Sequence, residues 1–448
     1  MKNDRREIFG WLCYDWANHS FFTLVLGVLI GEYLTSLAQR SVGDNGAILS
    51  FGGYGLVTAK SLYSYSVGIS VFLQVFFLPT LGAIADYTHL KKTFLAVFCY
   101  LGAFACALLV FAGEGHYLFG ALLFILANLG AGASIVFFNS FLSDITTEDM
   151  RDKVSSWGFA AGYLGGIATL IVGFLILYNA ERFGLSRVEA ERLCFLAAGI
   201  WWGGFSIFTL LLLKTRLPAR EAPAGKSYLA IGISELTDTF RELFRLKRTF
   251  HFLLGYLLYN DGIQTVIAMS AVFLSQELFE SRGIETDRIV LLIAFFLAQI
   301  FGFIGALLFE RIANFTSTKT AILISLAIWS LIVIYAYGFL ENTTEAYIMS
   351  AAIGLVLGGS QALSRSLFSQ MIPKGRESAF FGLYAISERG TSWIGPLVFG
   401  LVAQLTNSYR PAILCLIAFF VIGSIILFFT NTKQAIIDAG NTAPENAA

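Results

Sequence analysis

Twelve long apolar stretches alternate with short polar segments along the whole chain. Lipid offers no partner for backbone N–H and C=O groups, so a segment that crosses a bilayer forms a helix of about 20 mostly apolar residues. The pattern therefore predicts twelve transmembrane helices. They are expected at residues 10–35, 61–85, 92–112, 117–142, 155–179, 192–213, 251–278, 288–309, 320–340, 346–370, 379–405 and 411–430.

The composition agrees with a polytopic membrane protein. Of the 448 residues, 56% are apolar and only 13% are charged, about half the charged share of a soluble domain. The 30 Lys and Arg balance the 30 Asp and Glu, so no net charge attracts a polyanion such as a nucleic acid. Disordered, fibrous and disulfide-stapled proteins are excluded as well, and the lipid bilayer is the expected partner.

The basic residues outside the spans are distributed unevenly. The loops on the side of the two termini contain 20 Lys and Arg, whereas the opposite loops contain 8. Because positively charged loops stay in the cytoplasm, both termini are predicted to be cytoplasmic. The expected location is a bacterial inner membrane, or a vacuolar membrane if the source is eukaryotic.

The polar segment in the middle of the chain divides it into two domains. Residues 1–213 form an expected N-terminal six-helix bundle, and residues 251–430 form a C-terminal one. The linker at 214–250 contains an apolar repeat of three and four residues with interspersed Arg, typical of an amphipathic interfacial helix. A solvated spacer is the alternative for this linker. The polar tail at 431–448 is expected to be disordered.

The two bundles resemble each other in sequence, which is a mark of secondary transporters. One ungapped offset pairs residues 10–16 (GWLCYDW) with 255–261 (GYLLYND), and also Glu32 with Glu277. Shorter matches pair 81–86 with 304–309, and 139–143 with 365–369. A six-plus-six duplication with an axis along the membrane normal is therefore predicted.

Two loop motifs resemble the signature of the major facilitator superfamily. Gly82-x-x-x-Asp86 followed by Lys91 and Lys92 resembles its first loop, and Gly305 with Glu310 and Arg311 resembles the second copy. The resemblance implies an all-α fold of twelve transmembrane helices in two six-helix repeats. It also implies gating roles for the charged residues, namely Asp86, Lys91, Lys92, Glu310 and Arg311. The alternative for the two lysines is that they only anchor the loop in the cytoplasm.

Further segments resemble one branch of this superfamily, the autophagy-related vacuolar amino-acid effluxers and their bacterial relatives. These segments are 14–18 (YDWAN), 259–265 (YNDGIQT), 359–366 (GSQALSRS), 380–384 (FFGLY) and Gly395-Pro396. The resemblance covers nearly the whole chain and implies export of amino acids.

Polar side chains inside the spans are the candidates for substrate binding, because a charge at a helix centre costs about 2.5 to 3.5 kcal/mol. The clusters around Asp15 and Asp261 occupy repeat-related positions and are expected to face each other. Placement near the span ends, as helix-positioning groups, is the alternative. The candidates are Tyr14, Asp15, Asn18, Asn139, Asn260, Asp261, Gln264, Gln361, Arg365, Glu388 and Arg389.

Arg365 is the most informative of these residues, because a guanidinium keeps its proton and needs an anionic partner. We expect it to receive a carboxylate or phosphate of the substrate, while Glu388 or Asp261 receives an ammonium or a proton. A purely structural Arg365–Glu388 pair is the alternative. Proton coupling is expected through Asp15, Asp261 or Glu388, and sodium stays an alternative coupling ion.

Motifs for enzyme chemistry or ATP binding are absent from the sequence. Gly225-Lys226-Ser227 lacks the preceding glycine of a phosphate loop, since Arg220 stands there, and neither H-E-x-x-H nor G-x-S-x-G occurs. The five cysteines have no metal-ligand spacing. We therefore expect no enzyme activity, no cofactor and no metal site.

A monomeric secondary transporter is the function that remains. It would export amino acids or similar small zwitterions by alternating access, driven by protons. An alternative is a carrier of amphiphiles such as lysolipids, glycolipids or hydrophobic drugs, which the 43 Phe would suit. A third possibility is a receptor or scaffold that does not transport.

Overall fold

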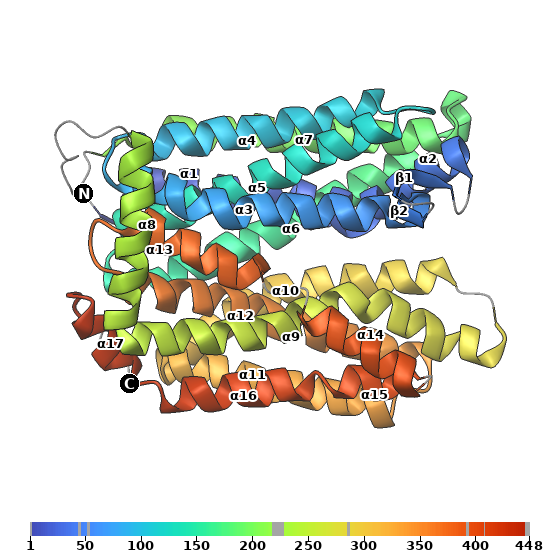
Figure 1. Ribbon diagram of the computed structural model, residues 1–448. Coiled ribbons are helices and arrows are strands. Elements are labelled where there is room, and N and C mark those ends of the chain that lie inside the picture. The colour runs from blue at the N-terminus through green and yellow to red at the C-terminus, as the bar shows by residue number, and fades with distance from the viewer. Residues whose placement is uncertain are drawn as a thin grey trace.

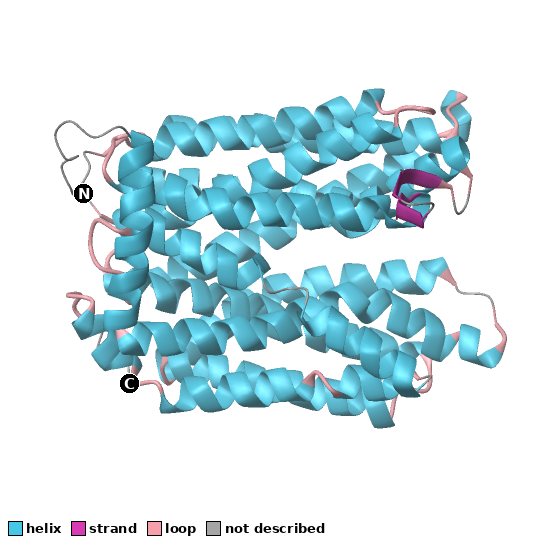
Figure 2. Cartoon of the chain, in the orientation of Figure 1, coloured by secondary structure: helices cyan, strands magenta, loops and turns pink. Residues whose placement is uncertain are grey.

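The computed structural model describes residues 2–43, 46–51, 54–216, 228–284, 287–390, 394–406 and 408–443, and almost all of them are helical (Figure 2). Eleven helices in this part of the chain are long and apolar enough to cross a membrane, and a shorter apolar helix covers Ile394–Thr406. The protein is therefore an integral membrane protein, as predicted.

The first half contains six spans. Its first span is α1, which continues without a turn through a π-helical segment, Ser20–Leu29, into α2. The helices are α1 (Arg5–His19), α2 (Ile30–Val42), α3 (Leu62–Asp86), α4 (Lys91–Leu108), α5 (Tyr117–Ile145), α6 (Arg151–Tyr178) and α7 (Arg187–Leu212).

A short β-hairpin follows α2, which the sequence analysis did not predict. Strands β1 (Ala47–Phe51) and β2 (Tyr54–Thr58) pair antiparallel. The hairpin lies at the end of the first half that is far from the two chain termini (Figure 1).

The second half begins after the linker. Its helices are α8 (Tyr228–Arg245), α9 (Lys247–Leu278), α10 (Arg288–Phe315), α11 (Thr318–Gly338), α12 (Thr343–Gln370), α13 (Glu377–Ala385), α14 (Ile394–Thr406), α15 (Tyr409–Leu414), α16 (Ile417–Phe429) and α17 (Thr432–Asp438).

In its described residues, the span predicted at 379–405 is not one regular α-helix, which corrects the expectation of a single helix. After α13 the backbone forms a π-helical segment, Ile386–Gly390, and a separate helix, α14, begins at Ile394. Together α13 and α14 form the eleventh span in chain order, and with the eleven long helices they make up the predicted total of twelve. Asp261 of α9 accepts a backbone N–H near the start of α14, as described below.

The prediction of a disordered tail is wrong for residues 431–443. Asn431 caps the short helix α17, and Arg248 at the start of α9 forms an ion pair with Asp438 at 2.6 Å. Asn441 donates hydrogen bonds to the carbonyl oxygens of Gln370 (2.8 Å) and Ile372 (2.7 Å). These oxygens end α12 and lack helical partners, so the tail satisfies them. Residues 444–448 lie outside the described part of the chain.

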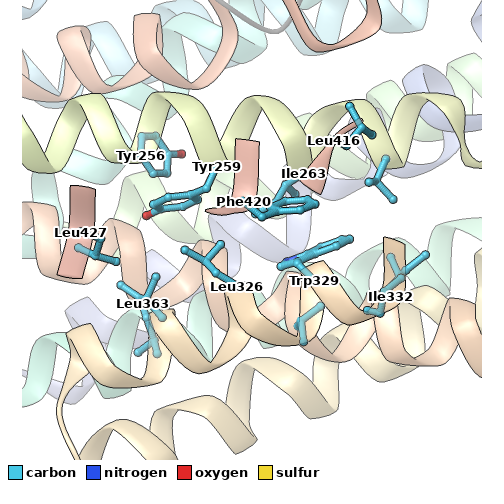
Figure 3. Packing of buried hydrophobic residues seen from close by; sticks show 14 of the residues in the cluster. Tyr256, Tyr259, Ile263, Leu326, Trp329, Ile332, Leu363, Leu416, Phe420 and Leu427 are labelled. Atoms are coloured by element: carbon cyan, nitrogen blue, oxygen red, sulfur yellow. The ribbon is translucent and has the colours of Figure 1, made fainter. Parts of the chain in front are cut away.

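Each half has its own apolar core. Trp11 and Trp202 are fully buried in the first, and Trp329 is fully buried in the second. Trp329 stacks on Phe420 with ring centroids 5.6 Å apart, and Tyr259 and Ile263 of α9 lie in the same cluster (Figure 3).

Two ion pairs reproduce the internal repeat. Glu32, near the far end of the first span, pairs with Arg187 at the start of α7, with 3.7 Å between the charged atoms. Its repeat partner Glu277 pairs with Arg410 at the start of α15, at 2.7 Å. Both pairs therefore link the first span of a half to its last, which supports the predicted duplication.

The two chain termini lie at the same end of the bundle, which we call the terminal face (Figure 1). Helix α8 runs across this face, transverse to the spans of both halves (Figure 1). Most hydrogen bonds between the halves that the structure shows come from the parts of α1, α3, α5, α6, α11, α12 and α13 nearest this face. The structure is thus closed at the terminal face.

Candidate functional site

Arg365 of α12 is inserted into the first half, where its guanidinium meets three helices. Its Nε donates to Ser155 Oγ at 2.9 Å, and its Nη2 donates to the Ser155 backbone oxygen at 2.8 Å. Its Nη1 lies 3.3 Å from Asp15 Oδ2 and 3.4 Å from Asn139 Oδ1. Arg365 and Asp15 are 3% and 4% exposed, so this is a buried ion pair between the halves.

Aromatic rings surround the guanidinium. Its Cζ lies 4.2 Å from the ring centroid of Phe159, 4.8 Å from that of Trp11 and 5.7 Å from that of Phe138. Rings at these distances attract a cation through their quadrupole. The site therefore holds a positive charge by hydrogen bonds, by one carboxylate and by three ring faces.

Helix α6 must be close to α1 for this geometry, and Gly158 makes this possible. A Cβ at Gly158 would lie 2.4 Å from Asp15 Oδ2 and 2.8 Å from Arg365 Nη2. A Cβ at Gly165 would lie 2.2 Å from the Trp16 backbone oxygen. A side chain at Gly165 would push the two helices apart, and one at Gly158 would displace the ion pair or α6.

A second polar layer lies one helical turn farther from the terminal face. It contains His19, four residues after Asp15, and Gln361, four residues before Arg365; both are half-buried. Tyr163 of α6 donates to Gln361 Oε1 at 3.4 Å. A turn of helix rises about 5.4 Å. The buried ion pair thus has a less buried polar layer directly above it on the same three helices.

The residues around Asp261 form a separate cluster within the second half. Asp261 Oδ2 accepts the backbone N–H of Gly395 at 2.8 Å, near the start of α14. Asn260 Nδ2 donates to the Glu388 backbone oxygen at 3.0 Å. The cluster therefore ties α9 to the interrupted helix, and Asp15 meets Arg365 instead of the Asp261 cluster that was expected opposite it.

The other predicted substrate residues are dispersed. Tyr14 is buried in the core of the first half, where its ring packs against Phe138, and Asn18 is buried one turn away. Gln264 is half-buried on α9. Arg389 lies in the π-helical segment, and its side chain is outside the described part of the chain.

The predicted gating residue Asp86 reaches across to the second half. Its two carboxylate oxygens accept the backbone N–H groups of Ser378 (2.9 Å) and Ala379 (2.8 Å) in the first turn of α13. A carboxylate is stabilised there by unpaired N–H groups and by the helix dipole. A Cβ at Gly82 would lie 2.4 Å from the Ser378 oxygen, so this glycine permits the approach.

The lysines predicted with Asp86 have other partners. Lys91 forms an ion pair with Asp144 at the end of α5, at 2.9 Å. Lys92 donates to the Leu213 backbone oxygen at 2.7 Å, where α7 ends. They therefore bind the loop to the first half, whereas Asp86 alone of the three contacts α13 through a hydrogen bond that the structure shows.

The second loop motif is less engaged. Glu310 accepts from Asn314 on its own helix at 2.7 Å, and Arg311 is exposed. The link between the halves at this place comes from Asp152 of α6, which accepts from the Thr318 hydroxyl at 2.5 Å at the start of α11. Sequence reasoning missed Asp152 and Ser155, because nothing in a local pattern distinguishes them from polar residues at a helix start.

A small polar cleft opens at the terminal face. Its lining includes Asp86, Lys91, Lys92 and Arg216, whose guanidinium lies 2.9 Å from the fully buried Glu7 carboxylate. The charged groups of this cleft are thus bound to ionic or backbone partners. Among the described residues, no group of His, Cys, Asp or Glu could hold a metal ion.

Comparison with known proteins gives a consistent result at the level of sequence. A family model described as vacuole effluxer Atg22 like matches residues 3–440. An uncharacterized MFS-type transporter, YxiO of Bacillus subtilis, is 31% identical over 432 residues, covering 96% of each chain. Autophagy-related protein 22 of Gibberella zeae is 25% identical over 514 residues, covering 91% of this chain and 76% of that protein.

Solved structures support the fold alone, since their sequences are distant. The outward conformation of FucP, a major facilitator superfamily transporter, has a TM-score of 0.68 and 11% identity, covering 95% of this chain and 98% of that one. A bacterial homologue of the iron transporter ferroportin in an outward-facing state has a TM-score of 0.66 and 14% identity, covering 96% and 99%.

Proposed function

Since the chain belongs to the Atg22-like effluxer family of the major facilitator transporters, we propose that it exports amino acids or similar small zwitterions by proton-coupled alternating access. Membrane transport by this fold needs no enzyme chemistry. The substrate and the coupling ion are the proposed part.

The buried pair of Asp15 and Arg365 is the observation that carries the proposal. It joins the two halves at the terminal face, and any opening there must separate the two charges. A zwitterion offers the same two charges as the pair. Its carboxylate can accept two parallel hydrogen bonds from the N–H groups of Arg365, and its ammonium can replace the guanidinium beside Asp15.

The proposed direction of transport is export, which rests on the description of the family as effluxers. With the terminal face in the cytoplasm, as the distribution of basic residues predicts, the structure would be closed toward the cytoplasm. Opening toward the cytoplasm releases Arg365 from Asp15 and Ser155. A cytoplasmic zwitterion then occupies the separated charges and is carried outward when the halves close again.

The energy for this cycle comes from an ion gradient, and a proton is the proposed ion. The carboxylates proposed to take part are Asp15, Asp261 and Glu388. In the closed state, Asp15 is paired with Arg365. Sodium is the alternative ion, and replacing it by choline at constant pH would leave a proton-driven flux unchanged.

Ligand-dependent thermal unfolding of the detergent-purified protein tests the substrate class. The panel contains amino acids, lysolipids and glycolipids at two pH values, with an unrelated carrier as the control. A ligand at 100 times its dissociation constant adds about 2.7 kcal/mol of stability, which is easily measured. We expect an amino acid to stabilise the native protein and to have less effect on Arg365→Lys, which cannot make two parallel bonds to a carboxylate.

The alternative class gives a different outcome in the same experiment. An amphiphile carrier would be stabilised by lysolipids or glycolipids beyond their effect on the control and by no amino acid. That result would contradict the proposal, as would full amino-acid stabilisation of Arg365→Lys.

A further inference from the structure

His19 lies one turn from the buried ion pair, and its hydrogen bonding defines the tautomer of its neutral ring. Its Nδ1 lies 2.9 Å from the backbone oxygen of Asp15. A carbonyl oxygen can only accept, so Nδ1 carries the hydrogen and Nε2 of the neutral ring carries the lone pair. The ring therefore presents a proton acceptor one turn above the buried ion pair.

The ring is fitted closely against α6. A Cβ at Gly162 would lie 2.2 Å from His19 Cε1 and 2.8 Å from Nε2, so only glycine leaves room for the imidazole at this place. On the other side, the ring centroid of Tyr163 lies 5.9 Å away. The imidazole thus occupies a shaped site between α1 and α6, and it is half-buried, whereas Asp15 below it is buried.

Three ionisable side chains face His19 from the described part of the chain. Asp15 lies on the same helix, Arg365 reaches in from α12, and Tyr163 comes from α6. Asp15 is already neutralised by Arg365, and a guanidinium does not release its proton. In the closed state, imidazole is therefore the group of this set suited to exchange a proton near neutral pH.

From this geometry we propose that Nε2 of His19 binds the coupling proton. The inference deepens the proposed function and rests on it. In the proposed step, a hydronium ion on the side away from the terminal face gives its proton to the lone pair of Nε2 and becomes water. The positive charge gained by the ring attracts the Asp15 carboxylate and repels the Arg365 guanidinium, so binding of the proton weakens the contact that closes the terminal face.

Nuclear magnetic resonance of the full-length protein with labelled histidine tests the site without any substrate. The chain has four histidines, namely His19, His89, His116 and His251. The signal that disappears in His19→Gln belongs to His19, and His116→Gln is the control, because His116 is exposed on the far loop. If His19→Gln does not fold, variants of the other three assign the signal by elimination.

We expect the His19 signal to titrate reversibly between about pH 5 and pH 8 in the native protein, as a histidine that exchanges its proton with water does. A signal that stays constant over this range would overturn the proposal, whatever the substrate is.

Flux in proteoliposomes gives the second readout, with an amino acid that stabilises the protein as the probe. A pH difference of one unit supports about a tenfold substrate gradient for one proton per cycle. We expect the native protein and His116→Gln to reach it, and His19→Gln to exchange substrate at equal pH but to reach no gradient. A normal gradient in His19→Gln would contradict the inference, whereas failure of every amino acid with the native protein would contradict only the proposed substrate class.

Discussion

The carboxylate of Asp15 lies 3.3 Å from Nη1 of Arg365, although 350 residues separate the two in sequence. One belongs to the first helix of the first half and the other to α12 of the second half. This pair therefore reports directly on whether the halves are together at the terminal face, and it gives the first prediction.

Arg365→Gln removes the cation and leaves the Asp15 carboxylate buried without its partner. Removing one member of a buried ion pair destabilises a protein by about 3 to 5 kcal/mol. We expect a clearly lower midpoint of thermal unfolding in detergent. The double variant Asp15→Asn with Arg365→Gln should recover part of this loss, because no buried charge remains. A double variant that shows the full sum of both single losses would mean that the two side chains do not interact.

Asp86→Asn replaces the carboxylate that accepts two backbone N–H groups of α13 by an amide with one acceptor oxygen. A charge at a helix N-terminus contributes about 0.3 to 1 kcal/mol, more where it is partly buried. Because this contact belongs to the closed state, we expect the transport rate to change several-fold and the ligand affinity to stay within about twofold.

Asp144→Asn is the matched control for this variant, because it removes the partner of Lys91 and leaves the bonds to α13 intact. Kinetics of Asp86→Asn that equal those of the native protein would exclude a gating role for Asp86.

Gly158→Ala places a methyl group 2.4 Å from Asp15 Oδ2. The ion pair must then move or α6 must shift, and overpacking of this kind costs about 1 to 3 kcal/mol. We expect a loss of transport and a lower unfolding midpoint. Gly204→Ala on α7 is the control, since a Cβ there meets no atom within 4 Å. A native-like Gly158→Ala would contradict the close approach of α1 and α6.

Glu277→Gln and Glu32→Gln test the repeat-related ion pairs. Glu277 is 13% exposed, and its partner Arg410 also donates to the backbone oxygens of Tyr337 and Leu340, whereas Glu32 is 62% exposed. A hydrogen bond between charged groups that are as little exposed as Glu277 contributes about 1.5 to 3 kcal/mol to the free energy of unfolding. An exposed pair contributes about 0 to 1 kcal/mol. The midpoint of thermal unfolding of Glu277→Gln should therefore be well below that of Glu32→Gln. Equal midpoints would contradict this prediction.

The attachment of α17 should not depend on pH in the physiological range. Hydrogen bonding from Gln434, followed by Arg248, lowers the pKa of Asp438 below its ordinary value of 3.8. The contribution of a carboxylate whose pKa falls on folding is complete above the unfolded pKa and is lost only as the pH decreases through lower values.

Amide hydrogen exchange of residues 432–443, corrected for the intrinsic effect of pH, should thus be constant from about pH 5 to pH 8. Asp438→Asn should accelerate this exchange throughout the range. Exchange that rises steeply toward pH 5 in the native protein would contradict this prediction.

Hydrophobic periodicity was sufficient for the number and order of the spans, since burial in lipid requires long apolar helices. It could not predict the break in the span at 379–405, because the apolar pattern continues through Ile394–Thr406. Asp261 of α9 accepts the Gly395 N–H at the start of α14, a tertiary contact that a local pattern does not encode. The contact between the tail and α12 was missed for the same reason, since Asn441 acquires its role only beside the end of α12.

The free-energy cost of a charge inside the membrane identified Asp15 and Arg365, each by itself, as residues that need partners. Their mutual pairing was not predicted, because repeat symmetry placed Asp15 opposite the Asp261 cluster instead. Repeat symmetry relates backbone positions, whereas the partner of a side chain depends on its length and direction. A long arginine on α12 reaches a carboxylate on α1 that a short aspartate on α9 does not.

The close packing of α1 against Gly158 and Gly165 of α6 has a consequence for how the two helices can move. With backbone and side-chain atoms of α1 in the space where Cβ atoms of Gly158 and Gly165 would be, the two helices have no clearance to slide past each other. An opening that carries α1 and α6 away from α12 together would separate Arg365 from Asp15 on one helix and from Ser155 on the other in the same displacement. Loss of this one side chain therefore removes contacts to two helices at once.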